Sequence, residues 1–350
     1  MTSAAAPLRV LVCEDSRTYA AALQRTLEHD QDIAVVAVCA TAEDALAKLE
    51  QLEPDLVTMD IELPGMSGLE AVEYIMGSRP TPILVLSSYV GPQTTAAAAA
   101  LAAGALDALA KDDLDLTQPG GAAAAAFRGR LKLLARARVI RHPRARLRPR
   151  KPRPRPDGTR RASAVGIVAS TGGPQALATV LGSLPADFGV PVFVVQHIAA
   201  GFIEGLVTWL DGAVPLPARL AEEGAMPRAG IWVAPEGAHL KLAPSGRLRL
   251  DRAADPGPHR PSGDVLLRSI AAVAGAEGVA VVLTGMGRDG AAGALAVQHA
   301  GGLALAQDEA GSAVFGMPKA AADLGVEVVL ALPEIAQTLA DLRPSMRSKP

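Results

Sequence analysis

The chain is poor in aromatic residues, in cysteine and in long apolar runs. Phe, Trp and Tyr make up 3% of its 350 residues, so its cores must be built mainly from alanine, valine and leucine. The longest apolar stretch, residues 96–106, is rich in alanine and stops at Asp107, well short of the roughly 20 residues that span a bilayer. No basic-then-apolar leader opens the chain, because Glu14 and Asp15 come too early for one. We therefore expect no membrane insertion.

The two cysteines, Cys13 and Cys39, lie in apolar runs that are typical of strands. They are interpreted as small core residues of a reduced protein, and they exclude a metal site built on cysteine. The sequence thus predicts a cytoplasmic protein.

Positive charge is concentrated in one segment. The net charge is −2, yet residues 128–161 hold 15 lysines and arginines and a single acid, Asp157. Between 141 and 161 arginine alternates with proline, which forbids a helix and predicts an extended linker. The length favours two domains, and we predict a first domain over 1–127, a basic linker over 128–162 and a second domain over 163–350. Such a linker could bind nucleic acid or anionic lipid. No aromatic residues interleave it, so a solvated linker is preferred and no nucleic-acid partner is expected.

Residues 8–127 alternate between strand and helix five times, which predicts a parallel sheet covered on both faces. The predicted strands are 8–13, 33–39, 56–60, 82–87 and 106–110, with helices such as 16–29 and 67–78 between them.

Five polar residues follow or end these strands: Glu14, Asp15, Asp60, Ser87 and Lys111. The carboxyl ends of parallel strands meet at one edge, where three close carboxylates repel one another unless a cation joins them. An oxygen-only ligand set suits Mg²⁺. Together with a hydroxyl and an ammonium, this forms a pocket for a phosphoryl group in which Asp60 is the nucleophile. The alternative is that each acid is merely solvated or caps a helix.

Three apolar runs in the second half also end in reactive residues. Residues 164–169 lead to Ser170, 191–195 lead to Gln196 and His197, and 279–283 lead to a glycine-rich stretch that contains Asp289. Unbroken apolar runs predict strands buried on both faces of a parallel sheet, so the second domain is also α/β. A serine, a histidine and an aspartate at one sheet edge are the nucleophile, base and orienting acid of acyl transfer.

Each of these residues also has a simpler interpretation. The turn at Ser170 could be a glycine-rich phosphate-binding turn, His197 could be a structural histidine at a strand end, and Asp289 between glycines could be a turn former. His239 and His259 are interpreted as structural or rim residues. The oxyanion would be held by backbone amides at the turn of Ser170 or in the 285–287 loop.

The first half resembles the response-regulator receiver domain over residues 8–127, on the run MDIELPGMSG at 59–68. This resemblance implies a flavodoxin-like fold. It also implies that Asp60 accepts phosphate from a chemotaxis histidine kinase, with Glu14 and Asp15 helping to hold Mg²⁺. Two positions depart from the usual receiver pattern. Ala108 stands where an aromatic switch residue is common, and Asp112 replaces the proline that usually follows the lysine.

Nearly the whole chain is similar to the CheB family of chemotaxis protein-glutamate methylesterases. The matching segments are ASTGGP at 169–174, QHI at 196–198, VAPEG at 233–237, HRPSGD at 259–264, LTGMGRDG at 283–290 and GMP at 316–318. The resemblance implies the triad Ser170, His197 and Asp289, with Thr171 and Met286 lining the site and no cofactor there.

The same resemblance implies methylated glutamates of methyl-accepting chemoreceptors as substrates, together with deamidation of receptor glutamines. Two positions depart from the family pattern: Ala199-Ala200 replaces a common proline, and Gly263 stands where a larger apolar residue is usual. These departures bear on the shape of the substrate groove and leave the triad untouched. A hypothesis of another class is a receiver-controlled binding protein that acts through its basic segment and carries an inactive hydrolase domain.

Overall fold

The computed structural model describes residues 6–88, 92–137, 139, 160–253 and 259–345. The chain divides into two compact units, Met1–Leu147 and Arg148–Pro350, which we describe separately. The arginine- and proline-rich core of the predicted linker, 141–159, lies outside the described residues.

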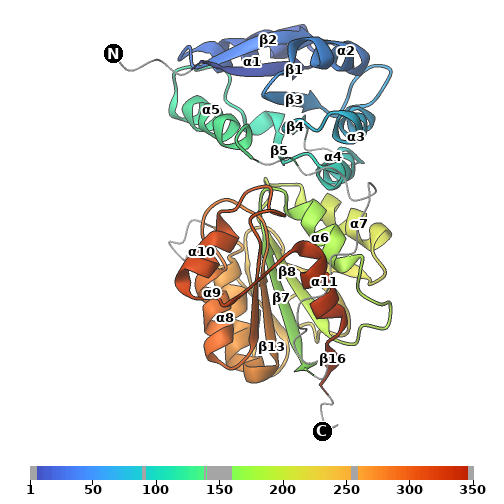
Figure 1. The fold of residues 1–350 in the computed structure, drawn as a ribbon, viewed down its shortest axis with the longest axis vertical. Helices are drawn as coiled ribbons and strands as arrows, with labels where there is room; N and C mark the ends of the chain where they lie inside the picture. The colour runs from blue at the N-terminus through green and yellow to red at the C-terminus, as the bar shows by residue number, and fades with distance from the viewer. Residues whose placement is uncertain (1–5, 89–91, 138, 140–159, 254–258, 346–350) are drawn as a thin grey trace. The chain divides into compact units, whose positions relative to one another are not determined.

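The first unit is a five-stranded parallel sheet with strand order β2-β1-β3-β4-β5. Helices α1 and α5 cover one face of this sheet, and α2, α3 and α4 cover the other (Figure 1). Its elements are β1 (Leu8–Cys13), α1 (Arg17–Glu28), β2 (Ile33–Cys39), α2 (Ala42–Leu52), β3 (Leu56–Asp60), α3 (Gly68–Ser78), β4 (Ile83–Ser87), α4 (Pro92–Ala103), β5 (Asp107–Ala110), the 3₁₀ turn Lys111–Asp113 and α5 (Ala122–Leu134).

Local sequence accounts for these elements. Strands β3, β4 and β5 are buried at every residue, as expected for apolar runs inside a parallel sheet. Helix α3 begins with a capping box in which Ser67 and Glu70 bond each other's backbone amides. The predicted five-stranded parallel fold is confirmed, and the predicted strands 82–87 and 106–110 each begin one residue early. Cys13 and Cys39 are both buried, as predicted.

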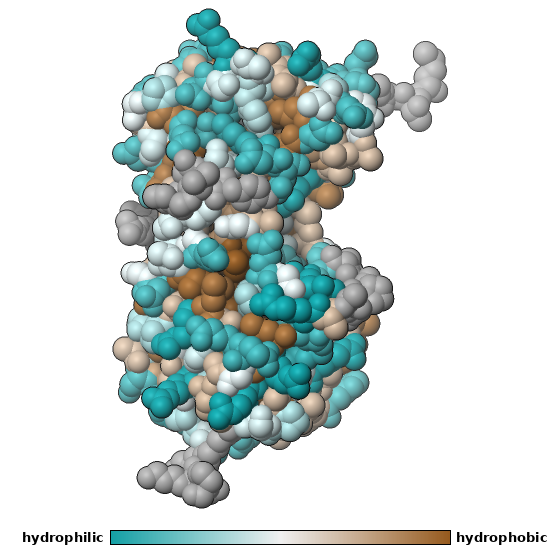
Figure 2. Space-filling view, turned by 180° about the vertical axis from the view of Figure 1, so that it is seen from behind, coloured by the Kyte–Doolittle hydropathy of each residue, from teal (hydrophilic) through white to brown (hydrophobic). Residues whose placement is uncertain are grey.

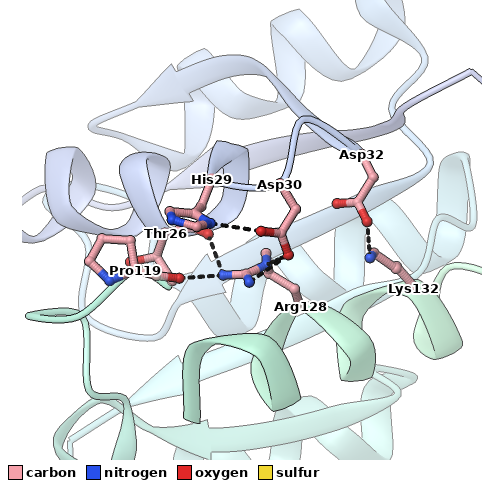
Figure 3. Close-up of polar contacts among 7 residues, drawn as sticks. All are labelled: Thr26, His29, Asp30, Asp32, Pro119, Arg128 and Lys132. Atoms are coloured by element: carbon pink, nitrogen blue, oxygen red, sulfur yellow. Dashed lines mark hydrogen bonds and ion pairs between the residues drawn. The ribbon is translucent and has the colours of Figure 1, made fainter. Parts of the chain in front are cut away.

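Helix α5 continues through Leu134, past the predicted start of the linker at residue 128. Its residue Arg128 is 2% exposed, and the guanidinium donates to Asp30 at 3.0 and 2.6 Å and to two backbone carbonyls (Figure 3). One turn further on, Lys132 pairs with Asp32. These cations therefore belong to the packing of the first unit, and the boundary at 128 falls inside a helix.

The second unit contains a seven-stranded parallel sheet with strand order β15-β14-β13-β7-β8-β10-β9. Helices α8, α9 and α10 cover one face, and α6, α7 and α11 cover the other (Figure 1). Its elements are β6 (Arg161–Ala162), β7 (Ala164–Ala169), α6 (Gly173–Leu181), β8 (Pro191–Gln196), α7 (Ile203–Ala213), β9 (Ala218–Leu220), β10 (Gly230–Val233), β11 (His239–Leu242), β12 (Leu248–Asp251), α8 (Gly263–Ala274), the 3₁₀ turn Gly275–Glu277, β13 (Gly278–Val282), α9 (Ala291–His299), β14 (Leu303–Gln307), α10 (Met317–Leu324), β15 (Val328–Leu330), α11 (Leu332–Ala340) and β16 (Arg343–Pro344).

The centre of this sheet is formed by β13, β7 and β8, which are buried along almost their whole length. The predicted second α/β domain is thus confirmed. Strands β11 and β12 form a separate antiparallel hairpin. Strand β6 pairs with β16, which attaches Arg161 and Ala162 to this unit.

Apolar side chains are largely withdrawn into the two cores. Figure 2 shows a mostly hydrophilic face on which apolar side chains gather in a few patches. Within the described ranges, the large apolar side chains that are exposed are Val38, Tyr74, Leu133, Met226, Leu324 and Val329. No helix among the described residues is both long and apolar enough to cross a bilayer.

Candidate active site and candidate phosphorylation site

The carboxyl edge of the central strands in the second unit gathers the predicted serine, histidine and aspartate. Ser170 follows β7, His197 follows its neighbour β8, and Asp289 lies in the loop after β13 on the other side of β7. The amide of His197 donates to Ala169, the residue before Ser170, at 2.9 Å. The strand order therefore brings together three residues that are far apart in the chain.

The backbone turns sharply at Ser170, where strand gives way to helix. The Ser170 amide donates to the carbonyl of Thr284 at 3.0 Å, and the Ser170 carbonyl accepts from Gly173 at 2.7 Å. Gly172 has a φ of +73°, and a Cβ atom there would lie 2.7 Å from the methyl group of Ala313. Both conformation and space therefore require glycine at position 172.

His197 and Asp289 form a pair with one partly and one fully buried side chain. Nε2 of His197 lies 2.9 Å from Oδ2 of Asp289, and the two side chains are 13% and 8% exposed. Burial alone would raise the pKa of Asp289, but His197 and the backbone amides of Asp264 and Gly263 hold it below its usual range. Asp289 therefore stays ionised beside the ring. Because Nε2 faces Asp289, Nδ1 is the ring nitrogen that this carboxylate does not engage.

The carboxylate of Asp289 is also anchored to the start of α8. Oδ1 accepts from the hydroxyl of Ser262 at 2.8 Å and from the amide of Asp264 at 3.0 Å, and Oδ2 accepts from the amide of Gly263 at 2.6 Å. The first amides of a helix have no partner within the helix and favour an anion. This contact was not predicted, because nothing in the local sequence connects α8 to the loop after β13.

Packing explains the glycine at position 263, which is one of the departures from the family pattern. A Cβ atom at this position would lie 2.3 Å from Cγ1 of Val168 in β7. The absent side chain lets the helix start approach the strand closely enough to reach Asp289. Gly263 packs against the sheet in this structure.

The candidate oxyanion donors, Thr171 and Met286, flank the turn. The loop after β13 passes very close to Ser170, since a Cβ atom on Gly285 would lie 2.6 Å from the Ser170 Cβ atom. The backbone at Thr171 is fixed by a hydrogen bond, because the Thr284 hydroxyl donates to the Thr171 carbonyl at 3.0 Å. Among the described residues, neither the Thr171 amide nor the Met286 amide has a backbone acceptor, so both remain available for a negatively charged oxygen.

A cavity of about 270 Å³ opens beside the His197 ring. It is lined by Gln196, His197, Ile198, Ala199, Ala200, Ile203, Ala234, Glu236, His259, Arg260 and Pro261. The small residues Ala199 and Ala200 thus lie in its wall, where a change of side chain alters the shape of the groove.

The two histidines interpreted as structural or rim residues both lie near this site. The ring of His259 stacks on that of His197, with centroids 4.5 Å apart and planes 17° apart. Burial and the nearby His197 lower the pKa of His259, which favours its neutral form. His239 is buried, and its Nδ1 accepts from the amide of Ser262 at 3.1 Å. His239 therefore supports the loop, whereas His259 contacts the predicted base, a role that the sequence did not reveal.

In the first unit, the predicted acidic cluster is assembled at one sheet edge. Carboxylate oxygens of Glu14, Asp15 and Asp60 all lie within 4.8 Å of one another. Lys111 reaches into the cluster, with its Nζ 2.6 Å from Asp60 and 2.7 Å from Glu14. Ser87 is buried at the end of β4, the strand beside Asp60.

The electrostatics of this cluster suit a divalent cation. Burial raises the pKa of Glu14 and of Asp60, although Lys111 opposes the rise in both. Burial alone would lower the pKa of Lys111, but its bonds to Asp60 and Glu14 raise it. The cluster thus gathers three carboxylates, two of which pair with the Lys111 ammonium, and an oxygen-only set with excess negative charge fits Mg²⁺. Ala108 is buried on β5 opposite Val85, so the usual switch position holds only a methyl group.

Taken together, the folds and the residue sets are those of a phosphoacceptor receiver joined to an α/β body of the serine hydrolase type. The family model for the response regulator receiver domain matches residues 10–117, and the CheB methylesterase model matches residues 165–339. The chain belongs to the CheB methylesterase family and carries an amino-terminal receiver domain.

Curated relatives match over nearly their full length. Protein-glutamate methylesterase/protein-glutamine glutaminase 4 of Myxococcus xanthus is 42% identical over 340 residues, covering 95% of this chain and 96% of that one. Protein-glutamate methylesterase/protein-glutamine glutaminase 2 of Anaeromyxobacter dehalogenans is 45% identical over 338 residues, covering 96% of this chain and 97% of that one. The crystal structure of the Thermotoga maritima CheB methylesterase catalytic domain is 36% identical, covers 51% of this chain and 98% of that one, and has a TM-score of 0.49.

Proposed function

We propose that this protein hydrolyses glutamate methyl esters on methyl-accepting chemoreceptors and deamidates receptor glutamines, in the cytoplasm and under control of phosphorylation. The observation that carries the proposal is the ion pair of the partly buried His197 and the buried Asp289, with Nε2 and Oδ2 2.9 Å apart, beside the turn that bears Ser170. The curated relatives, which bear the name of this activity, support the choice of substrate.

In the proposed reaction, Oγ of Ser170 attacks the ester carbonyl while His197 takes the hydroxyl proton. Asp289 orients the ring and stabilises its charged form, and the Thr171 and Met286 amides bind the oxyanion. The bond to the methoxy oxygen then breaks, His197 returns the proton and methanol leaves. Water, deprotonated by His197, hydrolyses the acyl-serine to glutamate and free serine. From a glutamine substrate, ammonia leaves in place of methanol.

In the first unit, Asp60 is the proposed phosphoryl acceptor, and a chemotaxis histidine kinase is the proposed donor. Glu14, Asp15 and Asp60 would hold Mg²⁺, which when bound neutralises phosphoryl oxygens. Lys111 and Ser87 would contact the phosphoryl group with an ammonium and a hydroxyl. The support is the close approach of the carboxylates and the position of Lys111.

The proposed division of the chain is a receiver over 1–127, a basic linker over 128–162 and a catalytic domain over 163–350. Because α5 ends at Leu134, we count its last turns with the receiver. Because β6 pairs with β16, we count residues 161 and 162 with the proposed catalytic domain.

The decisive experiment measures methanol release from methylated receptor membranes by the full chain, with and without a small phosphodonor and Mg²⁺. We expect release that depends on Ser170 and increases with the phosphodonor. If no ester is hydrolysed while the basic segment retains DNA in a salt-dependent way, the binding-protein hypothesis replaces this one.

A further inference from the structure

Gln196 is a buried polar residue at the active edge to which the proposed reaction assigns no role. It is the last residue of β8, it directly precedes His197, and it is 2% exposed. Its side-chain amide donates to the carbonyl of Ser170 at 2.8 Å and to the carbonyl of His197 at 2.8 Å. One NH₂ group therefore joins the backbone of the nucleophile to the backbone of the base.

This link lies where the sheet itself no longer connects the two loops. The pairing of β7 with β8 ends at Ala169 and Gln196, and the last backbone bond runs from the His197 amide to Ala169. Beyond this point the chain turns into α6 on one side and toward the cavity on the other. The amide of Gln196 extends the connection past the end of the ladder, to the two residues whose separation determines proton transfer.

The surroundings are shaped to hold this side chain. A Cβ atom on Gly173 would lie 2.1 Å from Oε1 of Gln196 and 2.9 Å from the Ala169 methyl group. Gly173 does not have a positive φ, so its backbone conformation does not require glycine. The missing side chain instead provides the space that the amide occupies.

We propose that Gln196 is a positioning residue for ester hydrolysis, whose amide holds the Ser170 turn and His197 at the separation that proton transfer needs. A glutamine suits this task because its two N–H groups satisfy two carbonyls without adding a buried charge. The inference rests on the proposed roles of Ser170 and His197.

The test compares kcat and KM for methanol release by full-length variants. Gln196→Met keeps the length of the side chain but removes both donors, and Gln196→Glu keeps its shape while turning oxygens toward both carbonyls. Displacing reacting groups by about 1 Å can cost roughly 10²-fold in rate. We therefore expect kcat to fall about 10- to 100-fold in both variants, with KM changed less than about twofold.

A matched control removes a comparable pair of bonds away from the site. Gln298 donates to the carbonyl of Gly325 at 2.9 Å and accepts from the amide of Glu327 at 3.1 Å. Gln298→Met should leave kcat and KM unchanged.

A second arm separates positioning from a purely structural role. In a His197→Ala background, Gln196→Met should lower the residual rate less than about twofold, because residues that act as a unit are not additive. An equal loss in both backgrounds would show a structural role and overturn the proposal. So would an unchanged kcat in the Gln196 variants when Ser170→Ala is inactive. Activity that survives Ser170→Ala would instead refute the proposed mechanism.

Folding is monitored by circular dichroism and thermal unfolding. If Gln196→Met does not fold, Gln196→Asn replaces it, since its shorter amide reaches at most one of the two carbonyls. The same loss in kcat at unchanged KM is expected, and normal kcat in this variant would also overturn the proposal.

Discussion

Replacing Asp289 by asparagine should destabilise the second unit as well as inactivate it, because both carboxylate oxygens are fully used. Oδ1 accepts from Ser262 and Asp264, and Oδ2 accepts from Gly263 and lies 2.9 Å from Nε2 of His197. An asparagine must turn its NH₂ group toward one of these two pairs. In one orientation the NH₂ group faces the amide of Asp264, and in the other it faces the amide of Gly263. Either way, a backbone N–H faces another donor.

The expected magnitude follows from these contacts. A buried donor left without an acceptor costs about 1–3 kcal/mol, and the remaining bonds lose the charge that made them roughly twice as strong. The sum is roughly 2–4 kcal/mol of unfolding free energy. For a body of this size that corresponds to a fall of roughly 5–15 °C in melting temperature. Activity should fall about 10³- to 10⁴-fold, because the ring loses the carboxylate that orients it.

The effect should also depend on pH in a defined direction. The folded-state pKa of Asp289 is below its usual range, so its stabilisation is complete above the unfolded pKa of about 3.9. It is lost as pH falls through the lower folded value. The difference in stability between the native protein and Asp289→Asn should therefore be full at pH 7 and shrink in acid.

Thermal and urea unfolding of the full chain from pH 7 to pH 3 measure these quantities. Asp211→Asn is the control, because the Ala218 amide, at 2.8 Å, is the one donor to Asp211 among the described residues, and an asparagine carbonyl can keep that bond. It should change stability by less than about 0.5 kcal/mol. The reasoning would be refuted by a melting temperature of Asp289→Asn within about 2 °C of the native value. It would also be refuted if the difference in stability between the two proteins became larger in acid.

Three further predictions concern the reaction and its control. Ser170→Ala should abolish methanol release while circular dichroism shows an intact fold, and near-normal turnover would exclude a serine nucleophile. A small phosphodonor with Mg²⁺ should label the full chain and Asp60→Asn should block labelling, whereas equal labelling in EDTA would contradict the metal site. Cutting the chain near Arg155 should raise basal methanol release by about tenfold or less, or about 1.4 kcal/mol, because a long linker lowers the effective concentration of one unit at the other. A rise of several hundredfold would show tight inhibition instead.

The polar residues at the carboxyl edges of the two parallel sheets could be predicted from local sequence pattern alone. Apolar runs such as 164–169 and 279–283 are strands because every side chain in them is buried, and parallel strands end at one edge. Ser170 and Asp60 were placed in this way, without knowing which strands are neighbours. The same argument gave the cluster around Asp60, since its members all follow or end strands of one sheet.

Other features depend on contacts between segments that are distant in the chain, and no local pattern encodes these. Arg128 lies in a run of cations typical of a linker, yet it is buried because Asp30, 98 residues away, pairs with it. Chain order does not reveal that β7 lies between β8 and β13, which brings the loop of Asp289 to His197. Nor does it reveal that His259 stacks on His197. The sequence by itself determined which chemical groups stand at the strand ends, because strand and helix periodicity are local. Only the tertiary structure decided which groups touch, because close packing sets the contacts of each side chain with partners from the whole fold.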